Sequence, residues 1–164
     1  MNSIARFARL FALAGALVPV ATFAAPAARP TELLSACQLS PSRTNCDYGD
    51  PQATGCNNDA YNLAQADQLG VLRAVVRYSP SCKSAWARAV LLGSQPYSRI
   101  TAQITRSTGG LTSGITSRAE VYPNTAAVSN MVYIGDGSLA RAVATLQNGT
   151  GQIITQVQTG LVKP

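Results

Sequence analysis

The sequence of 164 residues contains no histidine, and acidic residues are scarce. Without histidine there is no Ser–His or Cys–His pair, so hydrolases that depend on such a pair are excluded. The sequence also lacks a Gly-x-Ser-x-Gly elbow and a glycine-rich phosphate loop followed by lysine. These absences leave no catalytic residue to assign, and the sequence indicates no cofactor.

The charge balance is moderately basic. Thirteen Lys and Arg residues face seven Asp and Glu residues, for a formal net charge of +6. Such an excess permits weak attraction to anionic polymers or membrane surfaces, although an ordinary solvated basic surface explains it better. The sequence carries no strong signal for nucleic-acid binding.

Long hydrophobic runs are missing except near the N-terminus. Arg6 and Arg9 precede a mostly apolar run over residues 10–23, and the small residues Ala24, Ala25 and Ala27 follow. A membrane span needs about 20 apolar residues, so a secretory signal is favoured over an anchor. We expect a signal peptide at 1–24, with cleavage as late as residue 27, and a secreted or periplasmic product without a membrane span. Residues 25–36 are expected to be a poorly ordered linker, followed by a single β domain at 37–164.

Four cysteines follow the expected signal peptide: Cys37, Cys46, Cys56 and Cys82. An even number in a small exported domain predicts two disulfides. Three pairings are open, of which Cys37–Cys46 with Cys56–Cys82 is favoured. A zinc site is the alternative, but there is no Cys-x-x-Cys pair and no histidine, so no metal ligand is assigned.

Alternating apolar residues predict strands after residue 70. Leu72, Ala74 and Val76 alternate with polar or exposed positions, and Ile100 and Ile104 belong to a second such run. Turn residues recur at intervals of about 8–12, as in antiparallel sandwiches and small barrels. Residues 107–110 predict a turn within a flexible stretch that reaches Gly114, and Asn148-Gly149-Thr150-Gly151 predicts a C-terminal hairpin. We therefore predict a mainly β fold, a small antiparallel sandwich or barrel, with a disulfide-stapled N-terminal loop region. Residues 58–67 and 139–146 contain alanine and remain open between helix and strand.

Three carboxylates, Asp47, Asp50 and Asp59, lie in the cysteine-rich loop region. Paired carboxylates catalyse some hydrolyses, and with Asn57 and Asn58 these oxygens are also of the type that binds Ca²⁺. However, Asp and Asn also form turns and cap helices, which accounts for the same residues more simply. A hydrolase would require two of these carboxyl groups to converge in an open cleft.

Several short motifs occur together in this sequence. They are Cys46-Asp47-Tyr48-Gly49-Asp50-Pro51, Thr54-Gly55-Cys56 with Asp59-Ala60, Arg77-Tyr78-Ser79-Pro80-Ser81-Cys82 with Ala85-Trp86-Ala87-Arg88, and Met131-Val132-Tyr133. Together they resemble the YjfA-like family of small secreted bacterial proteins. The resemblance covers roughly residues 37–146 and is less clear over 107–114 and the C-terminal hairpin. It implies an exported bacterial protein with bridged cysteines and a domain of unknown function, and it supplies no catalytic residues.

The preferred functional hypothesis is a non-enzymatic extracellular binding or interaction module. Its partner is expected to be an anionic envelope polymer or another extracellular protein. The alternative is a carboxylate-dependent hydrolase that acts on a cell-envelope or extracellular polymer. The candidate binding surface consists of Asp47, Tyr48, Asp50, Asn57, Asp59, Arg77 and Arg88.

Overall fold

The alternating segments form two antiparallel sheets in the computed structural model, which describes residues 34–68, 70–93, 99–121 and 124–164. The expected signal peptide, and all of the linker except residues 34–36, lie outside the described residues. The first sheet has the order β1-β2-β3-β6, and β7 also pairs with β3. The second has the order β5-β4-β8-β9. The strands are β1 (Tyr61–Gln68), β2 (Leu72–Ser79), β3 (Ser84–Leu91), β4 (Arg99–Thr108), β5 (Leu111–Val121), β6 (Ala126–Val128), β7 (Val132–Tyr133), β8 (Leu139–Gln147) and β9 (Ile153–Gln158).

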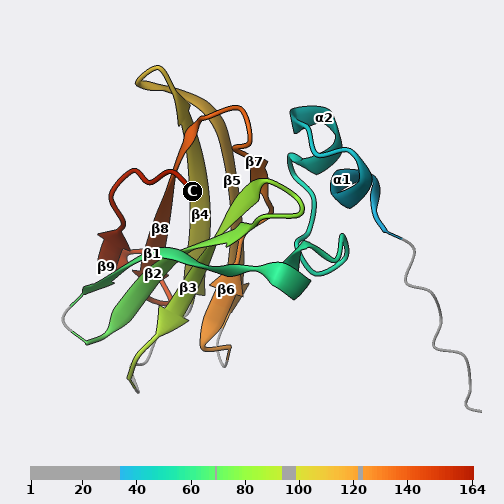
Figure 1. Ribbon diagram of the computed structural model, residues 1–164. Coiled ribbons are helices and arrows are strands. Elements are labelled where there is room, and N and C mark those ends of the chain that lie inside the picture. The colour runs from blue at the N-terminus through green and yellow to red at the C-terminus, as the bar shows by residue number, and fades with distance from the viewer. Residues whose placement is uncertain (1–33, 69, 94–98, 122–123) are drawn as a thin grey trace, which may run out of the picture. The chain divides into compact units, whose positions relative to one another are not determined.

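The two sheets form a sandwich within the unit Glu32–Pro164. The strands of the first sheet cross over those of the second (Figure 1). No ladder pairing joins the two sheets among the described strands, which decides between the sandwich and the barrel that the sequence left open.

Small side chains fill much of the space between the sheets. Leu72, Val76, Ile100 and Ile104 are fully buried there, as the alternation predicts. They are joined by a set of buried alanines from both sheets: Ala74, Ala85, Ala87, Ala89, Ala102, Ala127, Ala140, Ala142 and Ala144. Alanine is a poor strand former in isolation, so burial of this face outweighs local propensity.

Both segments that the sequence left open between helix and strand contain strands, β1 and β8. In β8, Ala140, Ala142 and Ala144 have no exposed surface, because they alternate on the face turned to the core. The predicted C-terminal hairpin is present, with β8 and β9 in antiparallel register. Residues 111–114, expected to continue a flexible stretch, instead begin β5, because the turn is completed at Gly109 and Gly110, which both have positive φ.

The N-terminal region is more regular than the predicted loop. It contains α1 (Ala36–Leu39), α2 (Arg43–Cys46) and the 3-10 helix η1 (Cys56–Asp59). Ser35 and Ser42 cap the first two helices by accepting backbone N–H groups. Helices of four residues are too short to show a helical periodicity in the sequence. The capping serines are the sequence signal that indicates these two helices.

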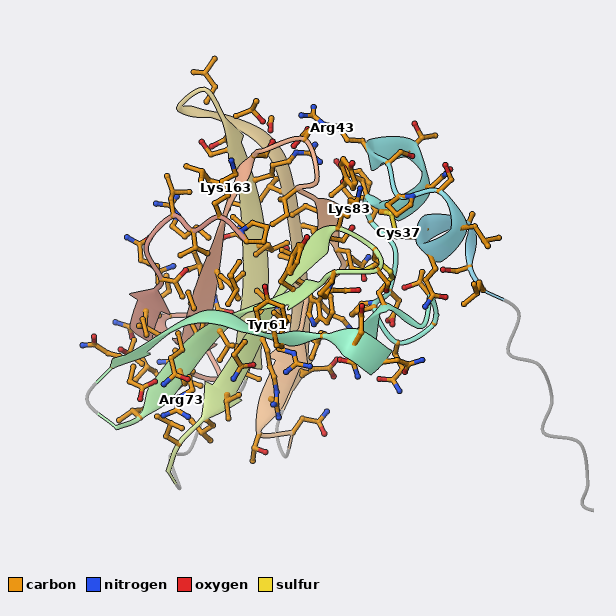
Figure 2. The ribbon with its side chains drawn as sticks, in the orientation of Figure 1. Cys37, Arg43, Tyr61, Arg73, Lys83 and Lys163 are labelled. Carbon is orange, nitrogen blue, oxygen red and sulfur yellow. A yellow bond between two sulfur atoms is a disulfide. The ribbon has the colours of Figure 1, made fainter. Side chains whose placement is uncertain are left out.

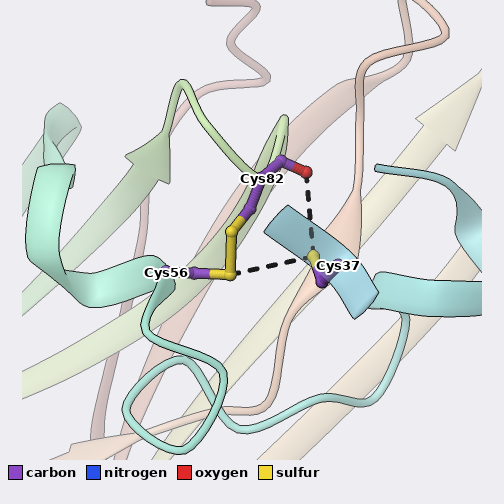
Figure 3. Close-up of side chains that lie close together, drawn as sticks. All are labelled: Cys37, Cys56 and Cys82. Carbon is purple, nitrogen blue, oxygen red and sulfur yellow. Dashed lines mark hydrogen bonds between the residues drawn. A yellow bond between two sulfur atoms is a disulfide. The ribbon is translucent and has the colours of Figure 1, made fainter. Parts of the chain in front are cut away.

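The disulfides are Cys37–Cys46 and Cys56–Cys82, which confirms the favoured pairing. The two bonds lie against each other, since the Sγ atoms of Cys37 and Cys56 are 3.7 Å apart (Figure 3). They form a second, smaller core with Trp86 and Met131 on the outer side of the first sheet. The close group of cysteine sulfurs holds no free thiol, so it offers no thiolate to a metal.

Within the part of the chain that the structure describes, no helix has the length and apolar composition needed to cross a membrane.

Candidate functional site

A cleft of about 450 Å³ lies where the N-terminal segment meets the outer face of the first sheet and β5. Its volume falls in the range of about 300–1,000 Å³ usual for small-molecule sites. Its lining comes from the N-terminal segment, from β2, β3 and β6 of the first sheet, and from β5 of the second. The lining residues are Asp50, Pro51, Gln52, Asn57, Arg77, Trp86, Arg88, Arg118, Glu120, Ala126 and Val128.

Strand alternation places two arginines in this cleft. Ala85, Ala87 and Ala89 of β3 point into the core, so Trp86 and Arg88 between them point outward. On β2, Arg77 lies directly opposite Trp86 in the antiparallel register. Arg77 and Arg88 are therefore diagonal neighbours on one face, within mutual reach of their long side chains.

The two arginines differ in the hydrogen bonds that their side chains make. Arg77 donates to Asn62 Oδ1 at 3.1 Å and to the Ala60 carbonyl at 3.0 Å. Burial, together with the positive charge of Arg88, lowers the pKa of Arg77. The Arg88 side chain is exposed, and its guanidinium donates no hydrogen bond to any residue that the structure describes. This end of the cleft therefore holds two like charges and lacks a carboxylate partner for either among the described side chains.

Trp86 forms the floor of the cleft without offering a stacking face. Its side chain is 2% exposed, because the disulfide region packs over it. Stacking of a sugar or base needs an open ring face, so Trp86 serves here as packing and supports the arginines that flank it.

A second group in the cleft lining consists of one arginine between two carboxylates. Arg118 of β5 donates from Nη1 to Asp50 at 3.3 Å and pairs through Nε with Glu120 at 3.1 Å. Asp50 also accepts the backbone N–H groups of Gln52 and Ala53, which fixes the loop that carries it. This group has more negative than positive charges.

Asp47, another candidate residue, has a structural position. Arg106 of β4 donates to both of its carboxylate oxygens, at 2.8 and 2.7 Å, and the Tyr133 N–H donates at 2.6 Å. The side chains of Arg106 and Asp47 are 4% and 12% exposed. Asp47 therefore joins the N-terminal region to both sheets, and it does not line the cleft.

Asp59 also has a structural position. Its carboxylate accepts from Ser79 Oγ at 2.5 Å and from the Ser81 N–H at 2.8 Å, in the turn between β2 and β3. Burial opposes ionisation, but these hydrogen bonds outweigh it and lower the pKa of Asp59. Tyr48 is 63% exposed, has a φ of +66°, and is absent from the residues lining the cleft.

The structure thus brings together four of the seven residues of the candidate surface: Asp50, Asn57, Arg77 and Arg88. The contribution of Arg118 and Glu120 could not be found from the sequence. Their alternation in β5 indicates only an outward face, and Arg118 meets Asp50 across 68 positions of sequence.

The hydrolase alternative gains no support from this geometry. Asp47, Asp50 and Asp59 accept from different partners, and of the three only Asp50 lines the cleft. Asp50 accepts the N–H groups of Gln52 and Ala53 within its own turn, as turn chemistry predicts. Asp47 and Asp59 instead accept N–H groups from residues distant in the sequence, Tyr133 and Ser81.

A further carboxylate, Asp136, joins the strand connection before β8 to the N-terminal helices. Arg43 of α2 reaches this connection (Figure 2) and donates its Nε–H to Asp136 at 2.8 Å, while the Ser138 N–H donates at 3.1 Å. Burial opposes ionisation, but hydrogen bonds from Ser138 and Arg43 outweigh it, and the pKa of Asp136 falls to about 2.

We predict that this contact weakens in acid. In the unfolded chain an aspartate has a pKa of about 3.9. Since the folded pKa is lower, the contribution of Asp136 is complete above pH 4 and is lost as the pH falls toward 2. Urea unfolding of the wild type and Asp136→Asn at pH 5 and pH 2 measures it. The variant should lose less stability between the two pH values, and an equal loss in both proteins would contradict the prediction.

Comparison with known proteins gives a family and no activity. No curated protein matches the chain. A solved structure, titled as a putative β-galactosidase from Bacteroides fragilis, is 16% identical, with 62% of this chain and 15% of that chain covered. Its TM-score of 0.29 is too low to be a basis for assigning a fold or a function, and this chain spans only a small part of that protein's length.

The family model described as "Protein of unknown function (DUF2690)" matches residues 44–143. This is more than half of the chain, and it includes every residue that lines the cleft. The match supports the expected kind of family, one built on an uncharacterised domain, but under a different name from the YjfA-like one. The chain belongs to the DUF2690 family of proteins of unknown function.

Proposed function

We propose that the protein is an exported, non-enzymatic binding module that holds an anionic group of its ligand between Arg77 and Arg88. The observation that carries this proposal is the pair of guanidinium groups in the cleft, neither of which is matched by a carboxylate among the described side chains. An anionic group between them relieves their repulsion and accepts charge-assisted hydrogen bonds.

The support for arginine as the binding group is chemical. A guanidinium presents a planar set of donors that matches the two oxygens of a carboxylate. Arg77 is oriented by Asn62 and Ala60, so less side-chain freedom is lost when a ligand binds. Arg88 supplies free donors on the exposed side of the same cleft.

The chemistry of the cleft favours binding over hydrolysis. Its two carboxylates, Asp50 and Glu120, both form ion pairs with Arg118. Asp50 accepts a hydrogen bond from Arg118, and Glu120 accepts one from Asn124. An acid–base pair needs one carboxyl group that donates a proton, whereas both of these act as acceptors. Export is supported by the N-terminal signal pattern and by two disulfides, which persist mainly in oxidising compartments.

Poly-L-glutamate is a suitable probe for the arginine pair. We expect Arg88→Gln to weaken its binding roughly tenfold to hundredfold, the usual effect of losing one hydrogen-bonded charge. Isothermal titration calorimetry at low ionic strength measures this change, since salt screens exposed charges.

Arg99→Gln is the matched control, since Arg99 is an exposed arginine of β4 that does not line the cleft. It should keep nearly all of the wild-type affinity. Equal losses in the two variants would indicate a general charge effect, and unchanged binding by Arg88→Gln would refute the site. A parallel titration with polyphosphate distinguishes carboxylate ligands from phosphate ligands.

A further inference from the structure

The cleft lining contains two charge groups of opposite sign. Arg77 and Arg88 of the first sheet supply positive charge without a paired carboxylate among the described residues. In the second group, Asp50 and Glu120 share a single arginine, Arg118. Two carboxylates and one guanidinium leave this group with an excess of negative charge.

The carboxylates Asp50 and Glu120 are partly exposed, and Glu120 can accept a hydrogen bond from a further donor. The Glu120 side chain is 28% exposed, pairs with Arg118 and accepts a hydrogen bond from Asn124, while the Asp50 side chain is 39% exposed. An ionised carboxylate has about four lone-pair positions, and these contacts do not use all of them on Glu120. A protonated amine in the cleft can therefore donate to Glu120 without displacing Arg118.

The remaining lining suits a peptide. Gln52 and Asn57 present side-chain amides, which both donate and accept, and Val128 and Trp86 form an apolar floor. Peptide groups also donate and accept, and small apolar side chains match such a floor. A polyanion can place one carboxylate between Arg77 and Arg88, but it supplies no positive charge for Asp50 and Glu120.

We infer that the cleft takes a short peptide that carries both a free carboxylate and a free ammonium group. The carboxylate binds between Arg77 and Arg88, and the ammonium group binds near Glu120 and Asp50. This inference rests on the proposed function, since it uses the same arginine pair, and it adds the second charge and the class of ligand.

Three probes of nearly equal size test it: tri-alanine, N-acetyl-tri-alanine and tri-alanine amide. The first carries both charges, the second only the carboxylate and the third only the ammonium group. Exposed ion pairs are weak, so we expect tri-alanine to bind about fivefold more tightly than N-acetyl-tri-alanine. Isothermal titration calorimetry with the full exported chain measures all three.

A substitution at Glu120 tests whether this carboxylate binds the ammonium group. Glu120→Gln should bring the affinity for tri-alanine close to that for N-acetyl-tri-alanine and leave the latter unchanged. Asp67→Asn is the matched control, because Asp67 is an exposed carboxylate of β1 paired with Arg73, outside the cleft. It should leave both affinities unchanged.

The possible failures are distinguishable. Equal binding of tri-alanine and N-acetyl-tri-alanine by the wild type overturns the inference and leaves the proposed anion site in place. Equal binding of tri-alanine and tri-alanine amide overturns both, since no carboxylate is then recognised. If none of the three binds, the inference fails, and the poly-L-glutamate titration decides the proposed function separately.

Discussion

Replacing Cys56 and Cys82 together by alanine should lower the free energy of unfolding by about 3.5 kcal/mol. The bond closes a loop with a sequence separation of 26, and loop-closure entropy gives a loss of about this size. Domains of this size are stable by only about 5–15 kcal/mol, so the variant would retain a reduced margin. The free energy of unfolding should fall measurably, because the bond ties η1 to the turn between β2 and β3.

The second disulfide provides an internal comparison. Cys37–Cys46 spans a separation of only 9, so its removal by alanine should cost about 2.5 kcal/mol on the same basis. The two loops do not overlap in sequence, so their constraints on the unfolded chain are separate. Alanine is preferred to serine because all four positions are buried and a hydroxyl would need a partner.

Urea unfolding followed by far-UV circular dichroism measures both losses. Near-UV circular dichroism reports on the same region, because Trp86 is the only tryptophan in the sequence and packs against the disulfides. A larger loss for Cys37→Ala/Cys46→Ala than for Cys56→Ala/Cys82→Ala would contradict the loop-length argument. It would mean that packing within the small core, and not chain entropy, sets the contribution of the bonds.

Replacing Arg106 by methionine should destabilise the protein by about 3–5 kcal/mol. Removing one partner of a buried ion pair leaves the other charge without compensation, and costs of this size are typical. Arg106 contacts Asp47, the Tyr133 carbonyl and the Ser113 carbonyl, so the loss affects several connections at once. Asp47 would keep only the Tyr133 N–H among its described partners.

A double-mutant cycle separates the pair from its surroundings. Asp47→Asn and the double variant should show a coupling well above zero, because the two groups are in contact, with Arg106 4% and Asp47 12% exposed. Arg73→Gln breaks an exposed ion pair with Asp67 on the first sheet and should cost much less. In Figure 2, Arg73 lies away from Cys37 and the disulfide region, so it makes a clean comparison. Equal losses from Arg106→Met and Arg73→Gln would contradict the structural role of the buried pair.

Gly114 is part of the same arrangement. A Cβ atom at this position would lie 2.8 Å from Nη2 of Arg106, so the absence of a side chain allows the guanidinium to pass across β5. The sequence suggests only a flexible stretch around this glycine. Its packing role appears once β4 and β5 are paired, with Arg106 opposite Gly114.

Much of the fold follows from local patterns. The alternation that predicts inward Leu72, Val76 and Ile104 depends only on the period of an extended chain, and those side chains are buried. The Asn148-Gly149 turn and the two disulfides are also as expected. These features hold because they depend on neighbouring residues or on short loops, where the geometry of the chain leaves few alternatives.

The site depends on distances that no local pattern encodes. The sequence places Asp47, Asp50 and Asp59 together as candidates, but only Asp50 reaches the cleft, while Asp47 pairs with Arg106 59 positions away. Turn chemistry accounts only for the backbone N–H groups that Asp50 accepts from Gln52 and Ala53. The packing of the two sheets and the disulfide region decides which carboxylate meets which arginine, because a charge becomes paired only with the partner that folding brings within hydrogen-bond distance.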